Sequence, residues 1–384
     1  MAPSRVARIL IVDDSAVMRA LLRSVVSSDK RLEVAGTASD GASALRATDS
    51  LRPDLILLDV EMPVMDGLST LKQMRASGKR IPVIMCSTLT QRGAKVTIDA
   101  LASGAADYVA KPSGQPSREA AVAALAQDLV PKILALTADA TTAPDSPLAS
   151  TSLFAPAPIH NSPWQSTPAV PSLPQPANSS PPAVVVIGVS TGGPAALDTL
   201  LPELPASFPL PVLIVQHMPE LFTGLLADRL NSRCPMRICE ATSGEPVRSG
   251  TVYIARGDWH MEVSTSGSST PILRLTQEAL ENHCRPAVDV LFRSAVAVYG
   301  SRILGVMLTG MGSDGLAGSR LIRQHGGTVL AQDQPTSVVW GMPGAVAQAG
   351  LAHRILPIHS IAPEILRLAG RGQREAFELR EPVV

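Results

Sequence analysis

Short runs of apolar residues recur along the N-terminal third of the chain, and each is followed by a segment with helical spacing. The runs are Arg8–Val12, Leu32–Ala38, Leu55–Leu58, Val83–Cys86 and Asp107–Val109. Runs that are almost wholly apolar predict strands buried on both faces of a sheet. The segments between them are apolar on one side only, and the last, Ala120–Leu136, predicts a closing helix. This alternation predicts an α/β domain with a doubly wound parallel sheet, the flavodoxin-like arrangement.

The same alternation returns in the C-terminal half. Buried strands are predicted at Val184–Ile187, Val212–Gln216, Ile303–Leu308 and Thr328–Ala331. Helical patterns follow at Pro219–Leu230, Val288–Tyr299 and Leu316–Gln324. Shorter strands, broken by turn residues at Gly257-Asp258 and Ser266–Ser268, are predicted at Arg237–Ala241, Thr251–Ile254, Met261–Val263 and Ile272–Leu275. This half therefore predicts a second doubly wound, Rossmann-like domain with a β-hairpin insertion.

Between the two halves the composition changes. Of the 33 prolines, 11 lie in residues 143–182, mixed with Ser, Thr and Ala. Such a segment buries too little apolar surface to fold and predicts a flexible linker, in which Phe154 and Trp164 are isolated. The expected organisation is a first domain at 6–136, a linker at 137–182, a second domain at 183–370 and a tail at 371–384.

Composition narrows the class of protein. A hydrophobic fraction of 45% over 384 residues predicts two globular domains, and a net charge of zero argues against a whole-chain electrostatic grip on nucleic acid or membrane. No apolar run looks long enough to cross a bilayer, and no signal peptide is recognisable, so a cytoplasmic protein is expected. The four cysteines, Cys86, Cys234, Cys239 and Cys284, show no metal-ligand spacing and are interpreted as buried, reduced residues.

Polar residues follow the predicted strands of the first domain, where ligands bind in a parallel sheet. They are Asp13, Asp14, Asp59, Ser87 and Lys111. Converging carboxylates repel one another unless a cation joins them, and oxygen ligands suit Mg²⁺. Lysine and serine supply donors for a phosphoryl group. Single aspartates at strand ends often only cap helices, but that explanation is poor for five residues on four strands.

The motifs Ile11–Ser15, Leu58–Gly67 and Lys111-Pro112 resemble those of response-regulator receiver domains. The resemblance implies Asp59 as phosphoacceptor, with Mg²⁺ held by Asp14, Asp59 and the Glu61 carbonyl and with Asp13 assisting. It implies that Ser87 and Lys111 contact the phosphoryl group. It also places Tyr108 where the family has an aromatic switch residue, although simple core packing explains a tyrosine there equally well.

The segment Val184–Pro194 carries the main motif of the second domain. Four apolar residues lead into Gly188-Val189-Ser190-Thr191-Gly192, which fits the G-x-S-x-G turn that raises a serine hydroxyl above a sheet edge. Pro194 then opens a helix at a position that proline tolerates. A phosphate-binding loop is an equal alternative on this stretch alone, because glycines before a helix also bind anions.

His217 and Asp314 follow two other strands of this domain, so a Ser190, His217, Asp314 triad is a candidate. The chain order Ser, His, Asp differs from that of α/β-hydrolases. Asp333 competes with Asp314 by spacing. A pairing of His283 and Cys284 is less favoured because neither residue follows a strand. His160 lies in the predicted linker, and His353 and His359 lie near the C-terminus.

Four motifs in order, Ile187–Pro194, Gln216–Met218, Arg285–Phe292 and Leu308–Gly315, make residues 183–350 resemble the catalytic domain of chemotaxis protein-glutamate methylesterases. The resemblance implies a serine hydrolase that demethylates glutamate methyl esters and deamidates glutamines on chemoreceptors. It implies Ser190 as nucleophile, His217 as base and Asp314 as orienting carboxylate. Thr191 would support the site, and the Met311 N–H would face the oxyanion. The hydrolase site would need no cofactor, and the linker is long for the family.

Other classes of protein fit less well. A nucleotide-binding oxidoreductase needs an acidic residue after its second strand, where this chain has Gln216-His217. A transcription factor needs a basic recognition helix, and the second half is neutral and rich in strands. A non-catalytic, receiver-based signalling adaptor remains the alternative. The expected partners are chemoreceptor helices as substrate and a histidine kinase as phosphodonor, with no nucleic acid and no membrane insertion.

Overall fold

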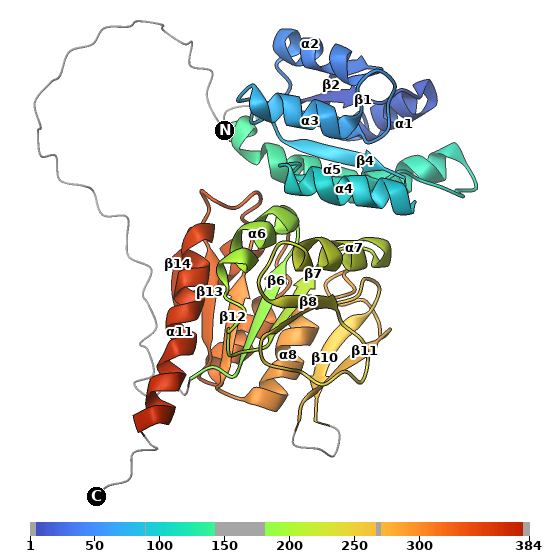
Figure 1. Ribbon diagram of the computed structural model, residues 1–384. Helices are drawn as coiled ribbons and strands as arrows, with labels where there is room; N and C mark the ends of the chain where they lie inside the picture. The colour runs from blue at the N-terminus through green and yellow to red at the C-terminus, as the bar shows by residue number, and fades with distance from the viewer. Residues whose placement is uncertain (1–4, 89, 143–180, 266–269, 379–384) are drawn as a thin grey trace, which may run out of the picture.

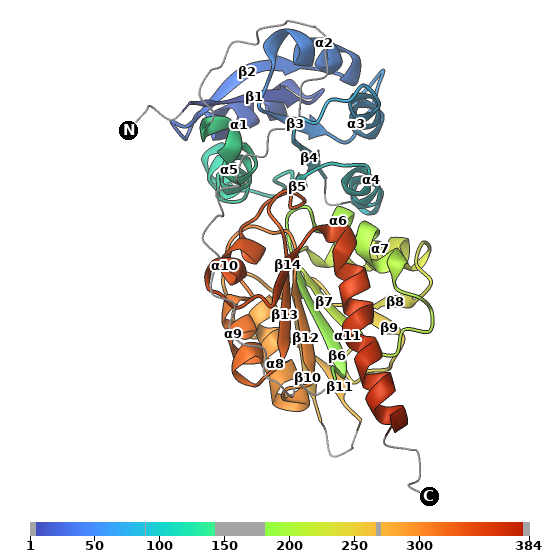
Figure 2. The same ribbon diagram turned by 90° about the vertical axis from the view of Figure 1, so that its left-hand side faces the viewer.

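The computed structural model describes residues 5–88, 90–142, 181–265 and 270–378. They form two α/β domains stacked end to end, as Figures 1 and 2 show. Nearly all of the predicted linker, and the turn at Ser266–Ser268, lie outside the described residues.

The first domain is a five-stranded parallel sheet in the order β2-β1-β3-β4-β5. Its strands are β1 (Ala7–Val12), β2 (Leu32–Ala38), β3 (Leu55–Asp59), β4 (Val83–Ser87) and β5 (Asp107–Ala110). Its helices are α1 (Ala16–Val26), α2 (Gly41–Leu51), α3 (Gly67–Ala76), α4 (Gln91–Ala102) and α5 (Arg118–Thr142). The sequence prediction of a doubly wound sheet is confirmed. The central strands are fully buried because their apolar side chains face helices on both sides.

Helix α5 is longer than predicted, since it runs six residues past Leu136. The boundary at 136/137 was therefore placed too early, because Ala138–Thr142 contains no helix-breaking residue before Pro144. By length and composition, the part Arg118–Ala138 would also suffice to cross a membrane, contrary to the expectation that no run is long enough. In the fold its residues Leu125, Leu129 and Ile133 instead pack in the core beside α1 and the sheet.

The second domain is a seven-stranded sheet in the order β14-β13-β12-β6-β7-β9-β8, and every pairing between neighbouring strands is parallel. Its strands are β6 (Val184–Val189), β7 (Val212–Gln216), β8 (Arg237–Glu240), β9 (Thr251–Ile254), β12 (Ile303–Met307), β13 (Thr328–Gln332) and β14 (Arg354–Leu356). In Figure 2, α6 (Gly193–Leu200), α7 (Glu220–Asn231) and α11 (Ile358–Glu378) cover one face of this sheet. The helices α8 (Val288–Tyr299), α9 (Leu316–Gln324) and α10 (Met342–Gln348) cover the other.

The hairpin insertion is confirmed, but it involves only half of the short strands. β10 (His260–Ser264) and β11 (Ile272–Thr276) pair antiparallel as a separate two-stranded sheet, whereas β8 and β9 extend the main sheet. The sequence reading missed α10, β14 and α11. The helical segment of α11 also continues to Glu378, past the predicted tail boundary at 370/371.

Helix α4 of the first domain packs against α6 and α7 of the second. The Tyr108 ring lies 4.6 Å from the Phe222 ring, centroid to centroid, and Arg229 pairs with Asp99 at 2.6 Å. The apolar cluster between α3, α4 and the first sheet is continuous with that beneath α6 and α7. The carboxyl ends of the second sheet, where its site residues lie, therefore face the first domain.

Candidate active site

Ser190 lies in the turn between β6 and α6, as the sequence predicted. Its N–H donates to the Thr309 carbonyl at 3.0 Å, and its own carbonyl accepts from Gln216 Nε2 at 3.0 Å. Gly192 has a φ of +80°, a conformation that favours glycine, and its N–H donates across the domain boundary to the Ala106 carbonyl. Hydrogen bonds on both sides thus fix the backbone that carries the serine.

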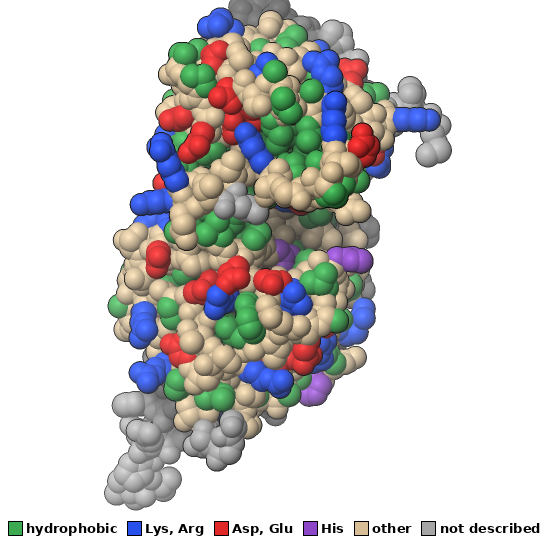
Figure 3. All heavy atoms as spheres, turned by 90° about the vertical axis from the view of Figure 1, so that its right-hand side faces the viewer, with side chains coloured by type: hydrophobic (Ala, Val, Ile, Leu, Met, Phe, Trp, Pro, Cys, Tyr) green, Lys and Arg blue, Asp and Glu red, His purple; other side chains and the backbone are tan. Residues whose placement is uncertain are grey.

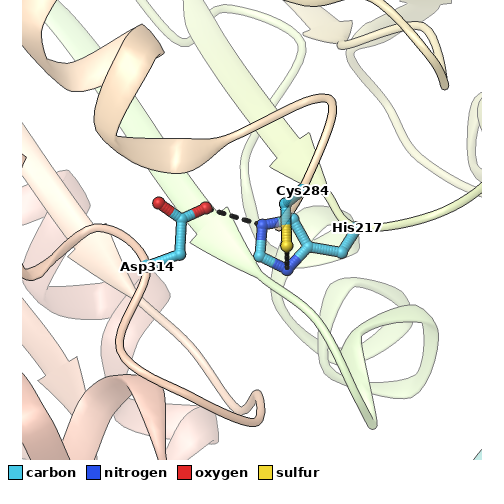
Figure 4. Close-up of side chains that lie close together, drawn as sticks. All are labelled: His217, Cys284 and Asp314. Carbon is cyan, nitrogen blue, oxygen red and sulfur yellow. Dashed lines mark hydrogen bonds and ion pairs between the residues drawn. The ribbon is translucent and has the colours of Figure 1, made fainter. Parts of the chain in front are cut away.

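His217 lies directly after β7 and contacts Asp314 in the loop after β12. His217 Nε2 is 2.8 Å from Asp314 Oδ2, as the dashed line in Figure 4 shows. A carboxylate only accepts, so Nε2 carries the proton and donates it. In the neutral ring Nδ1 then holds the free lone pair, and Nδ1 is the atom available to act as a base. No hydrogen bond joins Ser190 to His217 among the described residues.

The Asp314 carboxylate is saturated with donors. Besides His217, the N–H of Val288 donates to Oδ2 at 2.7 Å, and the N–H of Asp289 donates to Oδ1 at 3.1 Å. These two amides open α8, whose N-cap residue, Ala287, offers no side-chain cap. Asn282 Nδ2 donates the fourth bond, to Oδ1 at 2.8 Å. Asp314 therefore caps α8 although it belongs to another loop of the chain, and the positive end of the helix stabilises its charge.

The contact between His217 and Asp314 favours the charged form of each residue. Burial lowers the pKa of His217, but the hydrogen bond to Asp314 and the neighbouring Cys284 sulfur outweigh this and raise it from 6.5 to about 9. Burial alone would raise the pKa of Asp314, yet the bonds from His217, Val288 and Asn282 hold it below its usual value. The imidazole is thus a stronger base than a free histidine.

Cys284 was interpreted as a buried, reduced residue, and the expected burial was wrong. Its side chain is half-buried, and Sγ lies 3.8 Å from His217 Nδ1. Ligand atoms of His217, Cys284 and Asp314 all lie within 4.8 Å of one another, which resembles a metal site. The geometry does not favour one, because the Asp314 carboxylate is already bound by four donors, and Cys284 lies at the opposite ring nitrogen from Asp314. Of the other three cysteines, only Cys86 is fully buried.

A cavity of about 1330 Å³ opens between the two domains, and Figure 3 shows the molecule hollowed at this junction. From the second domain it is lined by Ser190, His217, Cys284 and Met311, which brings the predicted nucleophile, base and oxyanion residue to one space. From the first domain it is lined by Tyr108 and Lys132, among others. The first domain therefore forms part of the wall of the candidate active site.

Thr191, which the resemblance implied would support the site, bonds the first domain. Its Oγ1 donates to Asp107 Oδ2 in the first domain at 2.6 Å, so its side chain contacts the domain boundary. The competitor Asp333 is not at the site, since its carboxylate accepts from Thr336. His353 contacts Arg323, while His283 is exposed in the turn beside Cys284. His160 lies outside the described residues.

In the first domain, the predicted strand-end residues converge. Lys111 Nζ lies 2.8 Å from Asp13 Oδ2 and 2.7 Å from Asp59 Oδ1. Carboxylate oxygens of Asp13, Asp14 and Asp59 lie within 4.8 Å of one another. Burial raises the pKa of Asp59, partly offset by Lys111, and the backbone N–H of Glu61 bonds the same carboxylate. The oxygen ligands and the single lysine fit a divalent cation beside a phosphoacceptor.

Ser87 and Tyr108 lie on the side of this cluster toward the second domain. Ser87 is buried, and its Oγ accepts from Thr97 Oγ1 at 2.8 Å. Tyr108 is buried against Phe222, and burial raises the pKa of its phenol well above 10. Core packing and a switch position were equal explanations for this tyrosine. Its contact lies at the boundary between domains rather than inside one core.

Comparison with known proteins identifies the family. The response regulator receiver domain family matches residues 9–123, and the CheB methylesterase family matches residues 185–365. A protein-glutamate methylesterase/protein-glutamine glutaminase from Nocardioides sp. is 49% identical over 364 residues, covering 95% of this chain and 96% of its own. The chain belongs to the protein-glutamate methylesterase/protein-glutamine glutaminase family. The prediction of a receiver followed by a methylesterase domain is confirmed.

Other members of the methylesterase/glutaminase family are also similar along most of the chain. The protein of that name from Trichodesmium erythraeum is 45% identical over 367 residues, covering 94% of this chain and 99% of its own. The solved catalytic domain of the Thermotoga maritima CheB methylesterase is 43% identical and covers 49% of this chain and 98% of its own, with a TM-score of 0.48.

Proposed function

We propose that this protein is a phosphorylation-regulated hydrolase that removes methyl groups from glutamate methyl esters, and deamidates glutamines, on chemoreceptor proteins. The observation that carries the proposal is a shared cavity. Ser190 lines the same space as His217, and a buried, helix-capping carboxylate bonds His217. The membership of the family adds the identity of the reaction.

In the proposed mechanism, Ser190 Oγ attacks the acyl carbon of the ester or amide side chain while its proton passes to His217 Nδ1. Asp314 keeps Nε2 protonated and stabilises the imidazolium that forms. The backbone N–H of Met311 faces the oxyanion. The proton on Nδ1 then leaves with methanol or ammonia, and an acyl-serine remains. Water attacks the acyl-serine with the same base, which releases a glutamate carboxylate and restores the serine.

The proposed phosphorylation site is Asp59 in the receiver domain. Asp14, Asp59 and the Glu61 carbonyl would hold Mg²⁺ with Asp13 assisting, and the ion would neutralise charge on the incoming phosphoryl group. Lys111 bridges Asp13 and Asp59, so it is placed to contact a phosphoryl oxygen on Asp59. Ser87, one strand away, would contact another oxygen of the phosphoryl group. Tyr108 would respond to the movement of Ser87 toward that group.

Regulation is proposed to act by occlusion. The receiver domain forms one wall of the cavity that Ser190 and His217 line, and it bonds the Ser190 turn at Thr191 and Gly192. A chemoreceptor helix is much larger than that cavity, so the receiver has to move before such a substrate can enter. Phosphorylation would bias the receiver toward a state that packs less well on the second domain.

The proposed partners are chemoreceptor cytoplasmic helices as substrate and a histidine kinase as phosphodonor, which places the protein in the cytoplasm. The decisive experiment measures methanol release from methylated receptor fragments, with and without a small phosphodonor. Release that depends on Ser190 and rises with the phosphodonor supports the proposal. A protein that takes up phosphate without releasing methanol would be a signalling adaptor.

A further inference from the structure

Asn282 lines the cavity, and its side chain also bonds the Asp314 carboxylate of the candidate site. Its single amide nitrogen donates two bonds, to Asp314 Oδ1 at 2.8 Å and to Asp289 Oδ2 at 2.9 Å. An amide NH₂ has two hydrogens, so each carboxylate receives one. The opposite amide orientation would aim a carbonyl oxygen at two carboxylates, and electrostatics therefore fixes the orientation.

The two carboxylates that Asn282 joins are buried and neighbouring. Asp289 lies in the first turn of α8 and also accepts from the Gly318 N–H at 2.6 Å, at the start of α9. Asp314 bonds His217 and the first amides of α8. Two like charges held this close repel each other, and a neutral donor between them lowers that repulsion. Asn282 is the described side chain that donates to both.

We infer that Asn282 is a positioning residue for the hydrolysis: it holds the Asp314 carboxylate so that Oδ2 meets His217 Nε2 while Oδ1 stays tied to Asp289. The inference rests on the proposed function. Free rotation of the carboxylate would present Oδ2 to His217 at varying angles, and the ring would lose the fixed tautomer that leaves Nδ1 free to accept a proton. Asn282 acts through Asp314.

The turn that carries Asn282 offers a competing explanation for an asparagine. The backbones of Glu281 and Cys284 bond each other in both directions, at 2.9 and 3.2 Å. Asn282 and His283 between them have φ values of +53° and +63°. Such a two-residue turn favours Asn or Gly for conformational reasons alone. A test therefore has to remove the amide while it keeps the turn.

The substitution Asn282→Gly meets this condition, because glycine adopts the same positive φ. Arg52→Gly is the control: it makes the same change at an exposed residue with a φ of +48°, in the first domain and outside the lining of the cavity. We expect Asn282→Gly to lower kcat for methyl-ester hydrolysis about tenfold or more, as the loss of a charge-assisted bond implies, with KM changed less than twofold. Arg52→Gly should leave kcat within about twofold.

A double-mutant cycle separates positioning from a general loss of structure. If Asn282 acts through Asp314, then Asn282→Gly should change kcat less than twofold in an Asp314→Asn background. Equal factors in both backgrounds, or an unchanged kcat in the single variant, would overturn the inference. Ser190→Ala is measured alongside in the full chain. If that variant still hydrolyses the ester, the proposed function fails instead, so the two failures are distinguishable.

Asn282→Asp supplies a second readout that keeps the turn. The ionisable groups around the position are Asp289, Asp314, His217, Glu281 paired with Arg293, and Cys284. The like charges of Asp289 and Asp314 raise the pKa of a new carboxyl there. When protonated it donates to one neighbour, and when ionised it repels Asp314, so the kcat ratio of variant to wild type should fall as pH rises. A ratio independent of pH would indicate a purely structural role.

Discussion

Thr191 Oγ1 donates a 2.6 Å hydrogen bond to Asp107 Oδ2, and this bond joins the neighbour of the candidate nucleophile to the last strand of the receiver sheet. Asp107 begins β5, and Lys111, which bonds Asp59, directly follows the same strand. The phosphorylation site and the Ser190 turn therefore contact one short strand from its two ends. A shift of β5 on phosphorylation would therefore also move the contacts of the Ser190 turn.

Loosening the domain boundary should activate the unphosphorylated enzyme. Asp99 of α4 pairs with Arg229 of α7 at 2.6 Å, so Asp99→Lys replaces an attraction by a repulsion without altering the catalytic domain. We expect methanol release to rise about two- to tenfold without a phosphodonor, and a phosphodonor to add less than in wild type. Asp49→Lys on α2 makes the same charge change away from the boundary and should behave as wild type. An unchanged basal rate in Asp99→Lys would argue against occlusion.

The linker bears on the same mechanism. A receiver tethered by a longer chain returns to its docking surface at a lower effective concentration. Removing residues 1 to about 140 should raise activity above that of the unphosphorylated intact chain, by less than in relatives with short linkers. Rates of the 183–384 fragment and of the intact chain, with and without phosphodonor, provide the comparison. A fragment no faster than the intact chain would mean that the receiver acts by delivery to a partner instead.

The candidate triad predicts a graded set of losses. Ser190→Ala should reduce methanol release by at least about a thousandfold, because no other group supplies the nucleophile, while the melting temperature stays near that of wild type. His217→Ala should be nearly as damaging. Asp314→Asn should cost less activity, although it also weakens the cap of α8. Hydrolysis that survives Ser190→Ala and disappears in Cys284→Ala would identify the thiol as nucleophile.

Phosphorylation should depend on the acidic cluster. Asp59→Asn should abolish labelling by a small phosphodonor, and removal of Mg²⁺ by a chelator should do the same in wild type, since three carboxylates there repel an incoming phosphoryl group. Asp54→Asn, a carboxylate at the opposite end of β3, is the control and should label normally. Labelling without metal, or in Asp59→Asn, would contradict the receiver assignment.

The sequence predicted the parts of the structure that short stretches of neighbouring residues determine. The β-branched run before Gly188 and the aspartate after Leu58 mark strand ends, and the ends of parallel strands meet at one edge. That reasoning placed Ser190, His217 and Asp314 in one region. It missed Cys284, whose loop follows no strand of the main sheet and whose contact with His217 spans 67 residues of chain. The Thr191–Asp107 bond could not be predicted either, because the packing of one domain on another leaves no periodic pattern in a sequence.

The raised pKa of His217 determines how activity and stability depend on pH. A base has to be neutral to accept the serine proton, so kcat/KM should rise with pH, and the midpoint of the rise should lie near the His217 pKa of about 9. Stability runs the other way. The pKa of His217 in the folded protein lies above 6.5, the value of an unperturbed histidine. The stabilisation from this histidine is therefore complete below about pH 6.5 and is lost as pH rises through about 9. Thermal unfolding between pH 6 and 10 should show this loss.

Cys284 offers a way to move that midpoint, because its sulfur lies 3.8 Å from Nδ1 and contributes to the raised pKa of His217. Cys284→Ala should shift the rising limb of the kcat/KM profile to lower pH and increase the rate at pH 7. Cys239→Ala is the matched control, since that thiol contacts the Val252 carbonyl on a distant strand. Ser190→Ala supplies the blank for spontaneous ester hydrolysis at alkaline pH. An unmoved midpoint in Cys284→Ala would show that Asp314 alone sets the basicity of His217.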